Sequence, residues 1–168
     1  SKDYSRAMEA ILQTGMSSMA MREAYQRVAY YRAVELYHSS NWLKAKEFFN
    51  KSLTYQQNLT FVALAHFWMG ELAYKKGDAQ EALAQFESFL NTSGSYTLTE
   101  RTVSLYNKAY CLYKLDKLED ASAAFRVYLE DAKGDNKKNV DATLRLADLY
   151  FLLGKHSLGQ EYYKKFIA

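Results

Sequence analysis

The chain has 168 residues, of which 49% are hydrophobic and 24% charged, which is the balance of an ordinary folded domain. Its 22 basic and 19 acidic residues are interspersed and give a net charge of +3, so no segment has the charge density of a nucleic-acid or membrane patch. No apolar run approaches the roughly 18–20 residues that span a bilayer, and the lack of proline favours helices over β-sheet.

Amphipathic segments follow one another along the whole chain. Residues 1–15 predict a single short helix, and from residue 23 two kinds of segment alternate, which we call helix A and helix B. We expect helix A at about 23–38, 61–76, 100–115 and 139–153, and helix B at about 41–55, 78–92, 117–131 and 155–168. Residues 1–15 are then interpreted as the helix B of a preceding hairpin.

An internal repeat supports this division. In each helix B a small residue precedes a bulky one by four positions, and the small residues recur at intervals of 37 to 39 residues. The pairs are Ala7 and Ile11, Ala45 and Phe49, Ala82 and Phe86, Ala121 and Phe125, and Gly159 and Tyr163. Each helix A carries its own small residue, namely Ala33, Gly70, Ala109 and Ala147. Small residues at such positions allow two helices to cross closely.

Short polar breaks separate helix A from helix B in each unit. Gly77 is suited to the left-handed conformation that ends a helix, and Asp78 with Glu81 predicts a capping box at the start of the next. The chain is therefore expected to be all-α, a solenoid of antiparallel helix hairpins stacked as a single array over residues 1–168.

These residues resemble the tetratricopeptide repeat, whose pattern places Leu-Gly and Tyr on helix A and Ala-x-x-x-Phe on helix B. The second unit is the closest match, with Gly70, Tyr74, Ala82 and Phe86. The resemblance implies about four and a half repeats: the leftover helix at 1–15, then repeats at 23–55, 61–92, 100–131 and 139–168. The uncovered helices at both ends suggest a piece of a longer protein.

The period of the chain is longer than the 34 residues of the family, and the additional residues fall in the linkers from helix B to the next helix A. These linkers run over residues 54–60, 91–99 and 131–139. Long linkers are similar to those of bacterial cell-envelope tetratricopeptide proteins, including outer-membrane assembly lipoproteins. This similarity implies a bacterial protein of the periplasm or cell envelope, with the cytoplasm as the alternative.

The resemblance implies that helix A lines a concave groove in which a protein or peptide partner binds. Carried onto this chain, the register gives an aromatic lane with cations along one edge. The expected groove residues are Tyr30, Tyr37, His38, Phe67, Glu71, Tyr74, Lys75, Tyr106, Tyr110, Tyr113, Lys114 and Asp148. Tyrosine suits recognition because it combines a large apolar ring with a polar tip. Some of these rings could instead pack between neighbouring A helices.

Other functions find less support in the residues. The three histidines lie in different units without metal spacing, Cys111 is alone, and no phosphate loop or nucleophile motif occurs, so we expect no enzyme, metal or cofactor. Of the positions that clamp a C-terminal carboxylate in chaperone-binding relatives, only Asn107 is suitably polar. A helical repeat that binds RNA is disfavoured by Glu71, Asp141 and Asp148 in the groove. Self-association, as a homodimer through the exposed terminal helices, is the main alternative to groove binding.

Overall fold

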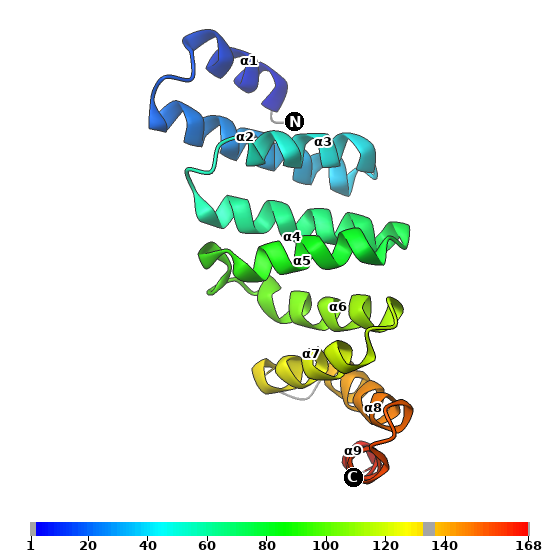
Figure 1. Ribbon diagram of the computed structural model, residues 1–168. Coiled ribbons are helices and arrows are strands. Elements are labelled where there is room, and N and C mark those ends of the chain that lie inside the picture. The colour runs from blue at the N-terminus through cyan, green and yellow to red at the C-terminus, as the bar shows by residue number, and fades with distance from the viewer. Residues whose placement is uncertain (1–2, 133–136, 168) are drawn as a thin grey trace.

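The computed structural model describes residues 3–132 and 137–167, and these residues form helices and no strand. The helices stack one above another from the N-terminus to the C-terminus (Figure 1). Their bounds are α1 (Tyr4–Thr14), α2 (Met19–His38), α3 (Trp42–Leu53), α4 (Leu59–Lys76), α5 (Ala79–Asn91), the 3-10 turn η1 (Ser93–Ser95), α6 (Glu100–Lys114), α7 (Leu118–Asp131), α8 (Lys137–Leu152) and α9 (His156–Ile167).

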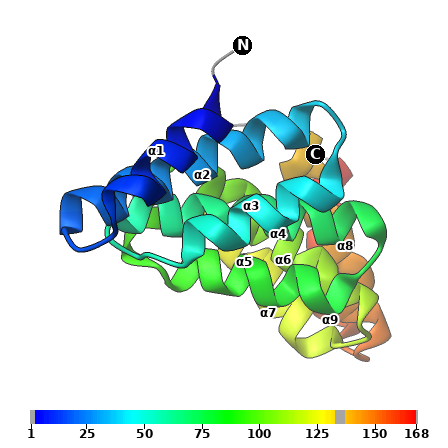
Figure 2. The ribbon, with the colours of Figure 1, turned by 90° about the horizontal axis from the view of Figure 1, so that it is seen from above.

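The all-α hairpin array predicted from the sequence is confirmed. The A helices are α2, α4, α6 and α8, each packs against the B helix that follows it, and each bound lies within a few residues of the predicted one. Helix α1 packs against α2, where the helix B of a preceding hairpin would lie. Seen from above, α8 and α9 run at a marked angle to α4 and α5, so the stack turns along its length (Figure 2).

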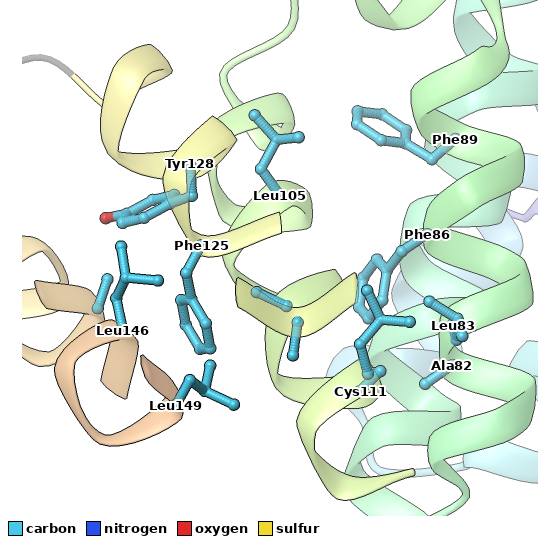
Figure 3. Packing of buried hydrophobic residues seen from close by; sticks show 14 of the residues in the cluster. Ala82, Leu83, Phe86, Phe89, Leu105, Cys111, Phe125, Tyr128, Leu146 and Leu149 are labelled. Carbon is cyan, nitrogen blue, oxygen red and sulfur yellow. The ribbon is translucent and has the colours of Figure 1, made fainter. Parts of the chain in front are cut away.

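Close crossings of small and aromatic residues hold each hairpin together. In the middle hairpins, Ala82 and Phe86 of α5 and Ala121 and Phe125 of α7 are fully buried. At Gly70 of α4, an added Cβ would lie only 2.8 Å from the ring of Phe86. Figure 3 shows Phe86 and Phe125 beside Leu105, Cys111, Leu146 and Leu149. The buried cluster to which they belong runs from α4 to α8, and Tyr162 of α9 packs against it.

Replacing Gly70 by leucine should therefore overpack the α4–α5 crossing and lower the free energy of unfolding by about 1–3 kcal/mol. Ala82→Leu, on the other side of the same crossing, should lower the free energy of unfolding by a similar amount. Ala84→Leu is the matched control, because Ala84 is exposed on α5. Urea unfolding measures all three variants, and a Gly70→Leu protein as stable as the parent would contradict this packing.

The four turns inside the hairpins share one backbone geometry. Each contains a residue with positive φ, namely Ser40 (61°), Gly77 (81°), Asp116 (58°) and Gly154 (71°). Asp78 caps α5 as predicted, since its carboxylate accepts a hydrogen bond from the Glu81 amide at 3.0 Å. The Glu81 side chain does not complete a capping box and instead contacts Gln85 at 3.1 Å and Lys46 at 3.4 Å.

The long linkers are held by specific contacts. Gln26 of α2 is fully buried, donates to the Asn58 carbonyl at 3.0 Å and accepts from the Asn58 amide at 2.9 Å. In the second linker, Gly94 lies so close to the Leu59 backbone that a Cβ there would be 2.3 Å from the Leu59 carbonyl oxygen. The third linker includes residues 133–136, which lie outside the described residues.

Candidate functional site

The four A helices share one surface that joins the hairpins, which we call the A-helix face. It comprises the side chains of α2, α4, α6 and α8 that contact the neighbouring A helix or lie exposed beside such contacts. Its described members include Tyr31, His38, Trp68, Glu71, Tyr74, Lys75, Asn107, Tyr110, Tyr113, Lys114, Asp141, Arg145, Asp148, Phe151 and Leu152.

Three of the predicted groove residues lie in the core. Tyr30 and Phe67 are 7% exposed and Tyr37 is 9% exposed, and all three belong to the buried clusters between the helices. They leave little surface for a partner, and their main contribution is packing. The other predicted residues are half-buried or exposed on the A-helix face: His38, Glu71, Tyr74, Lys75, Tyr106, Tyr110, Tyr113, Lys114 and Asp148.

At the first junction Trp68 is the central side chain. Its indole N–H donates to the Tyr30 hydroxyl at 3.1 Å, and its ring lies 4.7 Å from Tyr37 and 5.9 Å from His38. Sequence reasoning did not include Trp68 among the groove residues. Its position in the repeat could have identified Trp68, because the equivalent positions in the other repeats hold Tyr31, Asn107 and Arg145, which also lie on the A-helix face.

The predicted lysine edge is also a set of contacts between repeats. Lys75 lies 4.6 Å above the ring of Tyr37, and Lys114 lies 4.2 Å above the ring of Tyr74. Each lysine therefore stacks on the tyrosine of the preceding repeat by a cation–π contact. At the equivalent position of the last repeat stands Leu152, which is 63% exposed. The ring of Tyr113 thus lacks the lysine that the earlier tyrosines have.

Glu71 links α4 to α6 through the Asn107 amide, which donates to its carboxylate at 2.6 Å. Burial raises the pKa of the Glu71 carboxyl, while Lys75, Lys138 and the Asn107 hydrogen bond act in the opposite direction and offset only part of the rise. The ionised carboxylate is therefore less favourable in the folded protein than in the unfolded chain.

This raised pKa predicts a pH-dependent effect of Glu71→Gln, which keeps an acceptor for Asn107. Because the folded pKa lies above the unfolded one, the stability that Glu71 contributes is complete at low pH and is lost as pH rises above about 4.3. The variant should therefore melt above the parent at about pH 8, and the difference should vanish near pH 4.

Glu47→Gln is the matched control for this measurement. Hydrogen bonding and attraction to Lys51 lower the pKa of the exposed Glu47 carboxyl, so this substitution should lower the melting temperature at neutral pH. The melting temperatures of the two variants should therefore shift in opposite directions relative to the parent protein. A Glu71→Gln protein that melts below the parent at pH 8 would contradict the assigned environment.

At the junction of α6 and α8 the carboxylate of Asp141 accepts two tyrosine hydroxyls. Tyr106 donates to it at 2.7 Å and Tyr110 donates to the same oxygen. Burial and the hydrogen bond to Asp141 raise the pKa of Tyr110 to about 12 and also raise that of Tyr106, so both hydroxyls stay protonated donors at neutral pH. Arg145 lies 3.5 Å from Asp141 and pairs with Asp148 at 2.9 Å.

The A-helix face has the chemistry of a recognition surface. It presents aromatic rings, amides and charges of both signs, and among the described residues no group of histidine, cysteine, aspartate or glutamate is arranged to hold a metal ion. Burial raises the pKa of the Cys111 thiol to about 12, so it is not a thiolate at neutral pH. No helix in the described part of the chain is long and apolar enough to cross a membrane.

This arrangement defines an α-α solenoid of helical hairpins. Within it, residues 64–93 and 141–168 match the family model of the tetratricopeptide repeat. Such repeats generally mediate protein–protein interaction and are generally not enzymes. No curated protein matches the chain.

Solved structures show the same fold at low sequence identity. The "MamA RS-1 ArsTM double mutant" superposes with a TM-score of 0.65 and 13% identity, covering 98% of this chain and 90% of that one. Two structures of a Podosopora anserina kinesin light chain protein with nearly identical TPR-like repeats give TM-scores of 0.58 and 0.56, both at 13% identity. They cover 97% of this chain, and 81% and 85% of their own chains. At this identity the likeness concerns the fold alone.

Proposed function

We propose that the chain holds a protein or peptide partner along the A-helix face. The observation that carries the proposal is the run of incompletely buried aromatic and charged side chains that continues across α4, α6 and α8. Tyr74, Tyr110 and Tyr113 are half-buried there, beside exposed Lys75 and Lys114. Partly exposed tyrosines offer apolar area and a polar tip at low entropic cost.

The second half of the face carries aromatic and apolar side chains that are open to a partner. The side chain of Tyr113 makes no aromatic ring contact or hydrogen bond with any described residue, and beyond it Phe151 and Leu152 are 37% and 63% exposed. A partner with apolar anchors would cover these side chains, and an acidic group near Lys114 would strengthen the contact. We place the principal binding contacts at this end of the face.

The test compares two double variants that change the same kinds of residue on different faces. Tyr113→Ala with Lys114→Glu alters the A-helix face, and Leu43→Ala with Lys44→Glu alters an exposed apolar and lysine pair on α3. Partners are captured from the source organism, identified by mass spectrometry and then purified for titration. We expect the first variant to weaken partner binding by at least about tenfold, which is about 1.4 kcal/mol.

The α3 variant should bind like the parent. Circular dichroism and melting curves must show that both variants remain folded. Equal binding by the two variants, or a loss confined to the α3 variant, would move the binding site away from the A-helix face. We also propose, from the linker lengths, that the protein works in a bacterial cell envelope, and fractionation of the source cells tests this location.

Self-association is a second candidate, favoured by the exposed side chains of the last hairpin. Leu152 is 63% exposed and Leu158 is 42% exposed, whereas Tyr163 is half-buried and donates to Asp148 at 2.5 Å. The terminal helix also carries Phe166 and Ile167, whose side chains lie outside the described part of the structure. A homodimer through this end should dissociate in Leu152→Glu, as measured by sedimentation velocity, and a monomeric parent protein would rule it out.

A further inference from the structure

A second surface lies between the B helices α5 and α7. A hollow of about 390 Å³ opens there over α6, and we call it the α5–α7 groove. In Figure 1, α6 lies between α5 and α7, and its residues Leu105, Lys108 and Leu112 form the floor of the groove. The residues that line it are Glu87, Leu105, Lys108, Leu112, Asp120, Ala123, Ala124 and Val127.

Two adjacent alanines account for the size of the hollow. Ala124 occupies a position in α7 that is held by Phe48 in α3, Gln85 in α5 and Tyr162 in α9. With Ala123 beside it, the wall formed by α7 lacks the bulk that α3 and α9 carry at these two positions. The equivalent hollows are smaller, about 100 Å³ between α3 and α5 and about 310 Å³ between α7 and α9.

The α5–α7 groove is separate from the A-helix face. Leu105, Lys108 and Leu112 recur at intervals of three and four residues and therefore lie on one side of α6. Asn107 and Tyr110 fall on the opposite side, where they contact Glu71 and Asp141. A partner in the groove would thus leave the A-helix face uncovered.

The charged residues that line the groove are the carboxylates of Glu87 and Asp120 and the ammonium of Lys108, and the two helices that carry these carboxylates are acidic in a chain whose net charge is positive. Helix α5 carries two carboxylates and no basic residue, and α7 carries four carboxylates and one arginine, so the two helices together have a net charge of −5. The outer B helices α3 and α9 carry more lysine than carboxylate. The negative charge is therefore concentrated on the two helices that form this groove.

The mouth of the groove combines apolar surface with carboxylates that can receive a cation. Val127 is 48% exposed at the mouth, above the buried side chains of Leu105 and Leu112. Glu87 pairs with Lys108 at 3.0 Å, whereas the side-chain carboxylate of Asp120 makes no hydrogen bond or ion pair with any residue that the structure describes. An occupant that fits would bring apolar anchors for the floor and a positive charge for Asp120.

We propose that the α5–α7 groove binds a basic amphipathic helix of a partner protein. Its apolar side would lie against Leu105, Leu112 and Val127, and its lysines or arginines would face the carboxylates of Asp120 and Glu87. Helices that insert an apolar face into a groove commonly present anchors at three- and four-residue spacing. This second surface would allow the chain to hold two partners on opposite faces.

The experiment uses a fluorescent peptide of about 18 residues, designed as an amphipathic helix with leucines on one side and lysines and arginines beside them. Its twin carries glutamates in place of every basic residue. We expect the basic peptide to bind the whole chain at least about tenfold more tightly than the acidic twin, by fluorescence anisotropy. Binding should weaken as salt is raised, because the attraction is screened.

Two groove variants and two controls locate the peptide. Val127→Lys places a cation at the mouth and Asp120→Lys reverses the unpaired charge, and each should weaken the basic peptide about tenfold or more. Leu43→Lys makes the same exposed apolar-to-lysine change on α3 and should leave binding unchanged. The Tyr113→Ala and Lys114→Glu double variant should also bind normally.

Each alternative result overturns the proposal. Equal binding of the two peptides, or no binding, would show that the groove does not select a basic helix. Loss of binding in the Tyr113 and Lys114 variant alone would place the peptide on the A-helix face, which would leave the proposed function intact. If the chain without peptide forms a dimer that Val127→Lys dissociates, a second copy occupies the groove.

Discussion

The close crossing of the two helices in each hairpin is the contact on which the rest of the structure depends. At Gly70 and Phe86 the approach is so tight that a single added carbon would meet the aromatic ring at 2.8 Å. Repetition of this crossing sets the distance between helices and hence which side of each A helix turns inward to the core. The remaining sides are free of that constraint, and they carry the side chains with which the chain can bind other molecules.

The A-helix face joins the repeats as well as offering a surface. Lys75 and Lys114 stack on tyrosines of the preceding repeat, and Asp141 gathers the hydroxyls of Tyr106 and Tyr110. A partner that draws a lysine or a carboxylate toward itself would therefore weaken a contact between repeats. At the position of these lysines the last repeat has Leu152, which leaves the ring of Tyr113 open. For this reason the proposed contacts centre on Tyr113 and Leu152.

The helices and their pairing could be predicted because the small-residue and aromatic pattern recurs within each unit and depends only on local spacing. The burial of Tyr30 and Phe67 could not be predicted, because it depends on how far each helix A is rotated toward the core. Contacts such as Lys114 over Tyr74 join residues about one repeat apart, and no local pattern distinguishes them from an exposed lysine. The α5–α7 groove was also missed, although Ala123 and Ala124 mark it once the repeats are aligned.

The central claim is that a partner covers the A-helix face at the α6 and α8 end. Hydroxyl-radical footprinting of the chain with its captured partner measures this directly, because it reports the exposure of individual side chains. We expect Tyr113, Phe151 and Leu152 to lose reactivity toward hydroxyl radicals in the complex. Tyr96, which is 62% exposed in the linker between α5 and α6, should keep the same reactivity. Unchanged reactivity of Tyr113 and Leu152 in a saturated complex would contradict the claim.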